Sequence, residues 1–226
     1  EEFGPIRTPM RCGTRADTFG NNCGTFAGGS SERSTSKNHY FISGGYRPSK
    51  THSLSGRFVY RDGHFDLDFG AGRRFPRVSL GALLAPNAPL DPGPGALIEF
   101  RGSYAYQPTN ELRTTLDYTK QRLRRYDTDR VAFDVNLISW RTTYQFTRFL
   151  FARARIDYES LPRRARGQFL LGYTPSPGTA LYVGYNDDAN YSGFNRVNGL
   201  FDPGFRRNER TFFIKMSYLF RKSFGG

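Results

Sequence analysis

The chain has 226 residues, of which 37% are hydrophobic and 16% are aromatic, and its formal net charge is +13. It contains no apolar run of about 18 residues, which excludes a membrane-spanning helix, and its many aromatic residues are unlike the composition of a disordered chain. The 25 glycines and 13 prolines punctuate short segments throughout, which is typical of an all-β protein with many turns.

Residues 1–37 form the first part of the chain and contain both cysteines, Cys12 and Cys23. The chain starts at Glu1 with no initiator Met and no apolar leader, so we expect a chain that has lost its signal peptide or a piece of a longer protein. A metal site would need more ligands near the cysteines. We predict a disulfide formed in an oxidising compartment; the alternative is two free thiols in a loop.

From residue 38 onward, apolar and polar residues alternate with a period of two, which indicates β-strands. Helical periodicity is rare. The alternation predicts about eleven strands, which lie at 38–47, 52–61, 64–72, 77–84, 96–106, 111–124, 130–146, 149–160, 166–174, 179–186 and 210–220.

Most of these strands have one apolar face and one charged face. In the last strand the apolar face consists of Phe212, Ile214, Met216 and Tyr218. A soluble β-sandwich would hold the charges in water. Long strands with an aromatic-rich face along the whole chain instead favour an antiparallel transmembrane β-barrel, in which the apolar face meets lipid and the charged face lines a wet lumen. A closed barrel also satisfies every backbone hydrogen-bonding group without water.

The predicted connections alternate between longer loops and tight turns. Outer-membrane barrels have short periplasmic turns and longer extracellular loops, so we expect a periplasmic C-terminus and residues 1–37 outside the cell. The longer connections that would face outward are 187–209, 161–165, 125–129 and 85–95. An odd strand number does not close a usual single-chain bacterial barrel. We therefore expect residues 38–226 to hold about 10–12 strands that are the C-terminal part of a larger barrel.

Several motifs between residues 130 and 221 resemble one bacterial outer-membrane family. They lie at 144–150, 155–158, 171–186 and 212–221, and the most specific is the hairpin Pro175-Ser176-Pro177-Gly178-Thr179 followed by an apolar strand that ends Gly184-Tyr185-Asn186. The chain here is similar to the C-terminal barrel of a family whose members carry a carbohydrate-binding, family-nine-like domain at the N-terminus. The resemblance implies an outer-membrane barrel with a lost or separate N-terminal domain and no established enzyme activity.

Arginine dominates the basic residues, with 28 Arg against 5 Lys, and its planar donor fork suits phosphate and carboxylate groups. Charged residues in the middle of strands are expected to line the lumen: Arg57, Arg61, Arg101, Arg113, Arg153, Arg155, Asp157 and Glu159. Arginines near the predicted outer loops are candidates for contacts with lipopolysaccharide phosphates: Arg124, Arg125, Arg163, Arg164, Arg206 and Arg207.

These features predict an integral outer-membrane β-barrel that acts as a porin-like channel or as the membrane anchor of a larger envelope assembly. Its partners would be outer-membrane lipid, lipopolysaccharide and other envelope proteins. The lumen is either open and attractive to anions or filled by cross-strand ion pairs, as in a plugged scaffold, and sequence does not choose between them. The remaining alternative is a soluble β-sandwich that binds carbohydrate or nucleic acid; a nucleic-acid binder, however, usually gathers its basic residues on one element, so we expect no nucleic acid. No catalytic or metal-binding motif occurs, so we expect no enzyme activity, cofactor or metal site.

Overall fold

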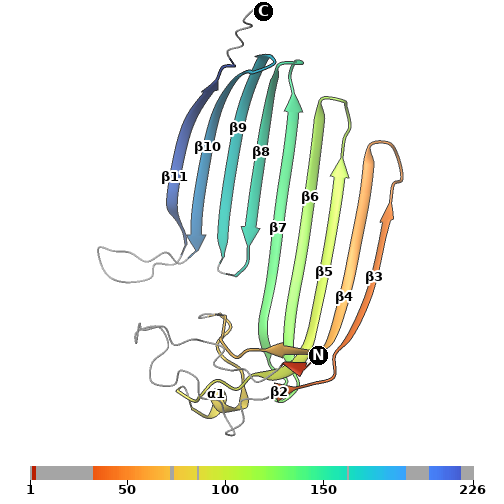
Figure 1. The fold of residues 1–226 in the computed structure, drawn as a ribbon, viewed down its shortest axis with the longest axis vertical. Coiled ribbons are helices and arrows are strands. Elements are labelled where there is room, and N and C mark those ends of the chain that lie inside the picture. The colour runs from red at the N-terminus through yellow and green to blue at the C-terminus, as the bar shows by residue number, and fades with distance from the viewer. Residues whose placement is uncertain are drawn as a thin grey trace, which may run out of the picture. The chain divides into compact units, whose positions relative to one another are not determined.

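The computed structural model describes residues 2–3, 33–71, 74–85, 87–161, 163–191 and 204–219. The fold is all-β, as predicted, and its main element is one antiparallel sheet of nine strands. The strand order is β11-β10-β9-β8-β7-β6-β5-β4-β3, so that strands consecutive in the chain are neighbours throughout (Figure 1). Two short strands, β1 (Glu2–Phe3) and β2 (Arg33–Ser34), pair with each other in a separate antiparallel sheet.

The strands of the main sheet are mostly long. Seven of them have between 13 and 15 residues, β8 has 10 and β3 has 9. Their bounds are β3 (Asn38–Tyr46), β4 (His52–Asp66), β5 (Gly93–Tyr106), β6 (Leu112–Arg125), β7 (Val131–Gln145), β8 (Leu150–Glu159), β9 (Arg164–Ser176), β10 (Thr179–Tyr191) and β11 (Phe205–Ser217). Among the described residues no pairing joins β3 to β11, so the sheet is open in that part of the chain.

The count of about eleven strands was wrong at two places. The predicted strands 52–61 and 64–72 are one strand, β4, which continues through Gly63 at a φ of +69°. The predicted strand 77–84 contains a helix, α1 (Leu80–Leu84), whose N-cap Ser79 accepts a hydrogen bond from the Ala82 amide at 3.2 Å. In the part of the chain that is described, no helix is long and apolar enough to cross a membrane.

The predicted alternation of connection lengths is present only in part, and the predicted bounds were inexact. Segment 67–92 is long, but 126–130 and 160–163 are no longer than 107–111 and 146–149. The connection predicted at 187–209 is shorter, because β10 extends to Tyr191 and β11 begins at Phe205. In an antiparallel sheet alternate connections belong to the same end of the strands. One series is 47–51, 107–111, 146–149 and 177–178, and the other is 67–92, 126–130, 160–163 and 192–204.

The chain divides into two compact units. The first, which we call the covered unit, comprises 1–43, 57–100 and 120–135; the second, the ladder unit, comprises 44–56, 101–119 and 136–226. Cys12 and Cys23 lie outside the described residues, so their disulfide stays a prediction.

The covered unit has a small apolar core on one face of its strands. Val78 of segment 67–92 packs there with Leu97, Leu123 and Ala132. Burial alternates along β5: Leu97 and Glu99 are buried, whereas Ile98 between them is 37% exposed. The buried face is therefore the one that carries charged residues, and segment 67–92 lies over it.

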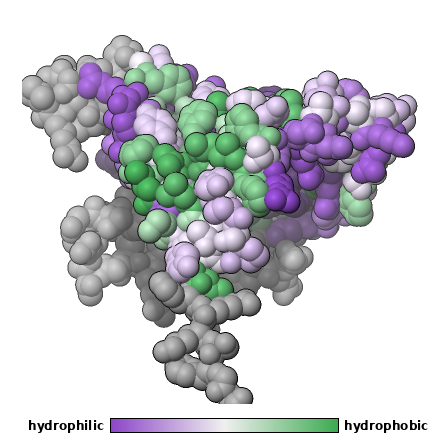
Figure 2. All heavy atoms as spheres, turned by 90° about the horizontal axis from the view of Figure 1, so that it is seen from above, coloured by the Kyte–Doolittle hydropathy of each residue, from purple (hydrophilic) through white to green (hydrophobic). Residues whose placement is uncertain are grey.

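The ladder unit shows two continuous faces of opposite character. The register aligns one apolar cross-strand row of Tyr144, Ala152, Leu171, Val183 and Ile214. A row on the other face consists of Arg141, Arg155, Gln168, Asn186 and Thr211. Figure 2 shows hydrophobic and hydrophilic side chains gathered in separate areas of the surface in view.

Two phenylalanine rings on the polar face of the ladder unit lie over glycines of the neighbouring strand. Phe151 is directly opposite Gly172, and Phe213 is directly opposite Gly184. A Cβ added at Gly172 would lie 2.3 Å from the Phe151 ring, and one added at Gly184 would lie 2.1 Å from the Phe213 ring. Glycine at these two positions therefore makes room for the rings.

Candidate functional site

The charged face of the ladder unit carries polar side chains from neighbouring strands β7 to β11. Strand β8 places Arg153, Arg155, Asp157 and Glu159 on this face, because side chains two residues apart in a strand point the same way. The register sets Asp157 directly opposite Arg166 of β9, and opposite charges in such positions stabilise a sheet.

Ion pairs run across several strands of this face. Arg164, which is directly opposite Glu159, donates from Nε to Asp188 of β10 at 2.7 Å and also pairs with it through Nη2. Arg166 approaches the same carboxylate at 3.8 Å. One aspartate thus holds two arginines, and these pairs connect β9 and β10.

All eight residues that were predicted to line a lumen lie on the polar faces of their strands. Those of β8 are described above. By alternation, Arg57 and Arg61 share a face of β4 with buried Val59, and Arg61 approaches Glu99 at 4.0 Å. Arg101 lies on the Glu99 face of β5, and Arg113 on the Asp117 face of β6. The structure groups these residues by face; whether that face lines a lumen remains a proposal.

Arg125, at the end of β6, is the centre of a buried polar cluster in the covered unit. Its side chain is 0% exposed. It donates to both oxygens of Asp127 at 2.9 and 2.6 Å, to Asp66 at 2.9 Å and to the carbonyl of Asp91 at 3.0 Å. Gly93 lets the guanidinium approach the backbone, since a Cβ there would lie 2.4 Å from Nη2. Arg125 therefore joins β4, β6, the end of segment 67–92 and the connection 126–130, and it lies against β5 at Gly93.

A second buried cluster anchors segment 67–92. The Asp68 carboxylate is fully buried, and its Oδ2 accepts hydrogen bonds from Arg77 and Ser79 and from the Asp91 amide. Arg77 also donates to the carbonyls of Ala88 and Pro89 at 2.8 and 2.7 Å. These contacts tie the beginning of the segment to its end, and they fix the start of α1 through Ser79.

The connection 126–130 shows how the covered unit controls ionisation. Burial opposes the charge on Asp127, but hydrogen bonds and charge attraction from Arg125 outweigh it and hold the pKa of this carboxyl below its usual value. Burial, together with the hydrogen bond that its hydroxyl donates to Asp62, raises the pKa of Tyr126 to about 12. At neutral pH this end of the sheet therefore carries an ionised Asp127 and a neutral Tyr126.

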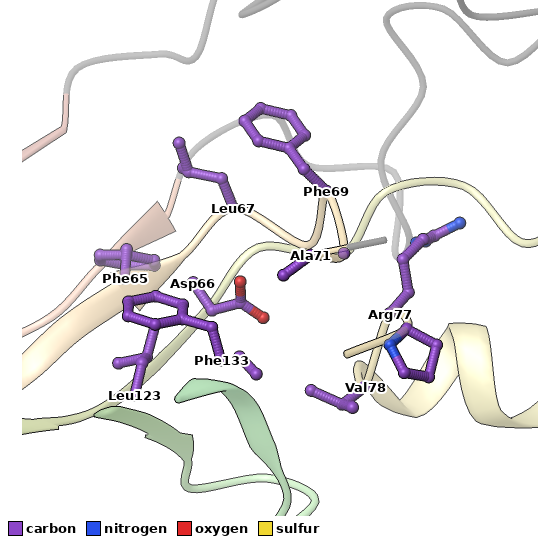
Figure 3. A pocket seen from close by; sticks show the side chains of 12 residues that line it. Phe65, Asp66, Leu67, Phe69, Ala71, Arg77, Val78, Leu123 and Phe133 are labelled. Carbon is purple, nitrogen blue, oxygen red and sulfur yellow. The ribbon is translucent and has the colours of Figure 1, made fainter. Parts of the chain in front are cut away.

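A cavity of about 250 Å³ lies between segment 67–92 and the strands of the covered unit. Figure 3 shows the Asp66 carboxylate among apolar side chains that include Ala71, Val78 and Phe133. Asp66 already accepts from Arg125 and from the Asp68 amide. The described lining of the cavity therefore consists of apolar walls around a carboxylate that already has its ion-pair partner.

The lipopolysaccharide prediction is wrong for Arg125, whose buried guanidinium is not available to any lipid. The other predicted arginines have varied surroundings. Arg124 pairs with Asp129 at 2.5 Å, Arg163 lies 4.8 Å from the Tyr191 ring, and Arg207 donates to Asp187 at 2.8 Å. Arg164 points across the charged face to Asp188, and the register sets Arg206 opposite Asn190 of β10.

The two buried clusters were missed by sequence reasoning. The partner Asp66 is distant from Arg125 along the chain, and nothing local marks an arginine in an alternating strand as buried. The signals in the sequence that the segment after β4 has its own structure were the Asp66-Leu67-Asp68 motif and the four prolines between residues 85 and 95. Comparison with protein-family models and with curated proteins finds no match for this chain.

Proposed function

We propose that this chain forms part of the wall of an outer-membrane β-barrel, with its charged face toward a porin-like lumen. One observation carries the proposal. On β11 the side chains of Phe212, Ile214 and Met216 are 64%, 65% and 78% exposed, and they continue the apolar face of the ladder unit. Soluble proteins rarely leave a contiguous apolar surface of this kind in water, whereas lipid is its natural surrounding.

The dimensions of the strands support a membrane location. A transmembrane β-strand needs about 9–11 residues, and seven strands of the sheet have between 13 and 15. One series of connections is short throughout and the other includes the long segment 67–92, which fits short periplasmic turns at one end and a longer extracellular loop at the other. The C-terminal end of β11 would then be periplasmic, and segment 67–92 would face outward.

In a membrane, the two edge strands of the sheet, β3 and β11, would need hydrogen-bonding partners. Open sheet edges do not occur within the hydrocarbon region of a membrane. Both β3 and β11 must therefore pair with further strands in the membrane. Such strands would come from another part of the protein or from another chain of the envelope.

A scaffold with a plugged lumen is the second candidate, and the covered unit favours it. Segment 67–92 lies over the polar face of its own strands, and Val78 packs on Leu97 and Leu123. A loop in that place would narrow a lumen or close it. Cross-strand ion pairs such as Arg164–Asp188 would fill the remaining space.

Planar-bilayer recordings separate these two functions. An open lumen should give steady channels that prefer chloride over potassium, and the preference should weaken as the screening length falls from about 10 Å at 0.1 M salt to about 3 Å at 1 M. Replacing Arg153 and Arg155 by Ser should shift the selectivity toward cations. A correctly inserted but silent protein would favour the scaffold. A chain that stays monodisperse in water without detergent would contradict both.

A further inference from the structure

The middle of the charged face contains a cavity of about 350 Å³ that is lined by cationic and amide side chains. Arg141, Arg155, Gln168 and Asn186 form one cross-strand row of its lining. Arg153 and Phe213 belong to the next row. We call this site the arginine pocket; all of it lies within the ladder unit.

Two of the three arginines have carboxylate partners. Arg141 and Arg155 are directly opposite each other on β7 and β8, an arrangement of like charges that destabilises a sheet unless the charge is balanced. Arg141 pairs with Asp117, and Arg155 approaches Asp157 at 2.8 Å. These four side chains together have no net charge.

The third arginine is not balanced. Among the described residues no carboxylate lies within ion-pair distance of Arg153, whose guanidinium lies 4.7 Å from the centre of the Phe151 ring. In the same part of the structure, the side-chain amides of Gln168 and Asn186 make no hydrogen bond to another described residue. The arginine pocket thus holds a net positive charge and several donors that have no acceptor.

We propose that the arginine pocket binds a small soluble oxyanion, meaning the carboxylate or phosphate group of an organic acid or phosphate ester. A guanidinium binds such groups through two parallel hydrogen bonds, and the amides of Gln168 and Asn186 add donors at the next two strands. Phe213 and the neighbouring Leu170 supply an apolar wall for the carbon part of the ligand. The inference concerns the folded chain and holds whether or not the sheet forms a membrane pore.

Arg113 provides a matched control for Arg153. It lies on the polar face of β6, outside the pocket, and no carboxylate among the described residues is within ion-pair distance of it. Arg153→Gln and Arg113→Gln therefore remove the same charge from the same kind of face. If anions are attracted only by the general charge of the face, both substitutions should weaken anion binding equally. If the arginine pocket is a specific site, only Arg153→Gln should weaken it.

The test is a titration in which the full chain, in a nonionic detergent, is added to inorganic phosphate. Binding is measured as broadening of the phosphorus NMR line. We expect saturable broadening with the wild-type chain. Arg153→Gln should weaken binding at least about tenfold, as expected for a lost hydrogen bond to a charged group, and Arg113→Gln should change it less than about twofold. Equal losses in both variants, or no saturable broadening with the wild-type chain, would overturn the proposal.

Lipid phosphates offer the same oxyanion chemistry, so a second titration uses a short-chain phosphatidic acid as competitor. A soluble ligand is supported if the lipid displaces phosphate no better than phosphate displaces itself. Displacement at a much lower lipid concentration would assign the pocket to a headgroup and overturn the proposal. Circular dichroism of each variant shows that the sheet is intact. Because binding is measured in detergent, a chain that binds phosphate but never inserts into bilayers would refute only the membrane function.

Discussion

The covered unit and the ladder unit use the same alternating strands, but they treat charged side chains differently. In the covered unit Arg125 is 0% exposed and has four hydrogen bonds. In the ladder unit the side chains of Arg141 and Arg155 are 53% and 51% exposed. The difference comes from segment 67–92, which lies over one polar face. Alternation thus decides which side chains share a face, and a connection decides whether that face is wet.

The largest expected effect is the loss of Arg125. Replacing it with Met should destabilise the chain by about 3–5 kcal/mol, because the largely buried Asp66 carboxylate, 13% exposed, would keep its charge without an ion-pair partner. Asp127, which is 33% exposed, would lose the same partner at a smaller cost. The measurement is a urea unfolding titration in detergent. The neighbouring Arg124→Met is the control: its pair with Asp129 is exposed, so about 0–1 kcal/mol is expected. If the two variants lose similar free energies of unfolding, the buried arginine does not contribute more to stability than the exposed one.

The second effect concerns the apolar face of the ladder unit. Ile214→Arg should cost about 2–4 kcal/mol if this side chain faces lipid near the bilayer midplane. Thr211→Arg and Ser217→Arg, which lie on the other face of β11 on either side of it, should be nearly silent. Folding into lipid vesicles in a denaturant titration measures all three. If the costs are equal, β11 does not have a lipid face.

A smaller loss of stability is expected from a substitution at Gly184, which lies under the Phe213 ring. Gly184→Ala should destabilise the sheet by about 1–3 kcal/mol, as overpacking does, because the Phe213 ring would have to move. Gly44→Ala on β3 is the control, since no atom lies within 4 Å of a Cβ there. Thermal unfolding of both variants in the same detergent checks the difference. If Gly184→Ala unfolds at the same temperature as the wild-type chain, the Phe213 ring can move aside without cost.

The smallest effect is a pH dependence that belongs to the covered unit. Asp127 has a lowered pKa in the folded chain, so its contribution to stability is complete above its unfolded pKa of about 3.9 and is lost as pH falls through the folded value. Asp127→Asn should therefore be less stable than wild type at pH 7 and approach it below about pH 4. Unfolding titrations at pH 7, 5 and 3 provide the measurement. A constant difference across this range would mean that Asp127 is not ionised in the folded chain.

Much of the sheet could be predicted from the sequence because each strand carries its own alternating pattern. The strand predicted at 111–124 is Leu112–Arg125, and the one at 149–160 is Leu150–Glu159. The pattern fails where the backbone departs from it. Asp62-Gly63 is typical of a tight turn, yet β4 continues through it. The apolar residues of 80–84 fit a strand as well as a helix, and Ser79 decides between them by capping α1.

The candidate site was predictable only in part, for a related reason. The face of the sheet on which Arg153 or Asp157 lies follows from the alternation of side chains along β8. The burial of Arg125 depends instead on where segment 67–92 and Asp91 come to lie, which no periodicity encodes. The strand number shows the same limit. Two strands were counted in excess, so the number stayed odd and the predicted direction of β11 relative to β3 did not change.

The rings that lie over Gly172 and Gly184 bear on how this sheet avoids misfolding. Sliding one strand by a single residue past its neighbour would send every side chain of that strand to the opposite face, so that charges would enter the apolar side. After such a slip the Phe151 ring would meet Leu171 or Tyr173 in place of Gly172. Each ring therefore fits the neighbouring strand in one alignment only, and the two rings fix the register of two antiparallel strand pairs, β8–β9 and β10–β11.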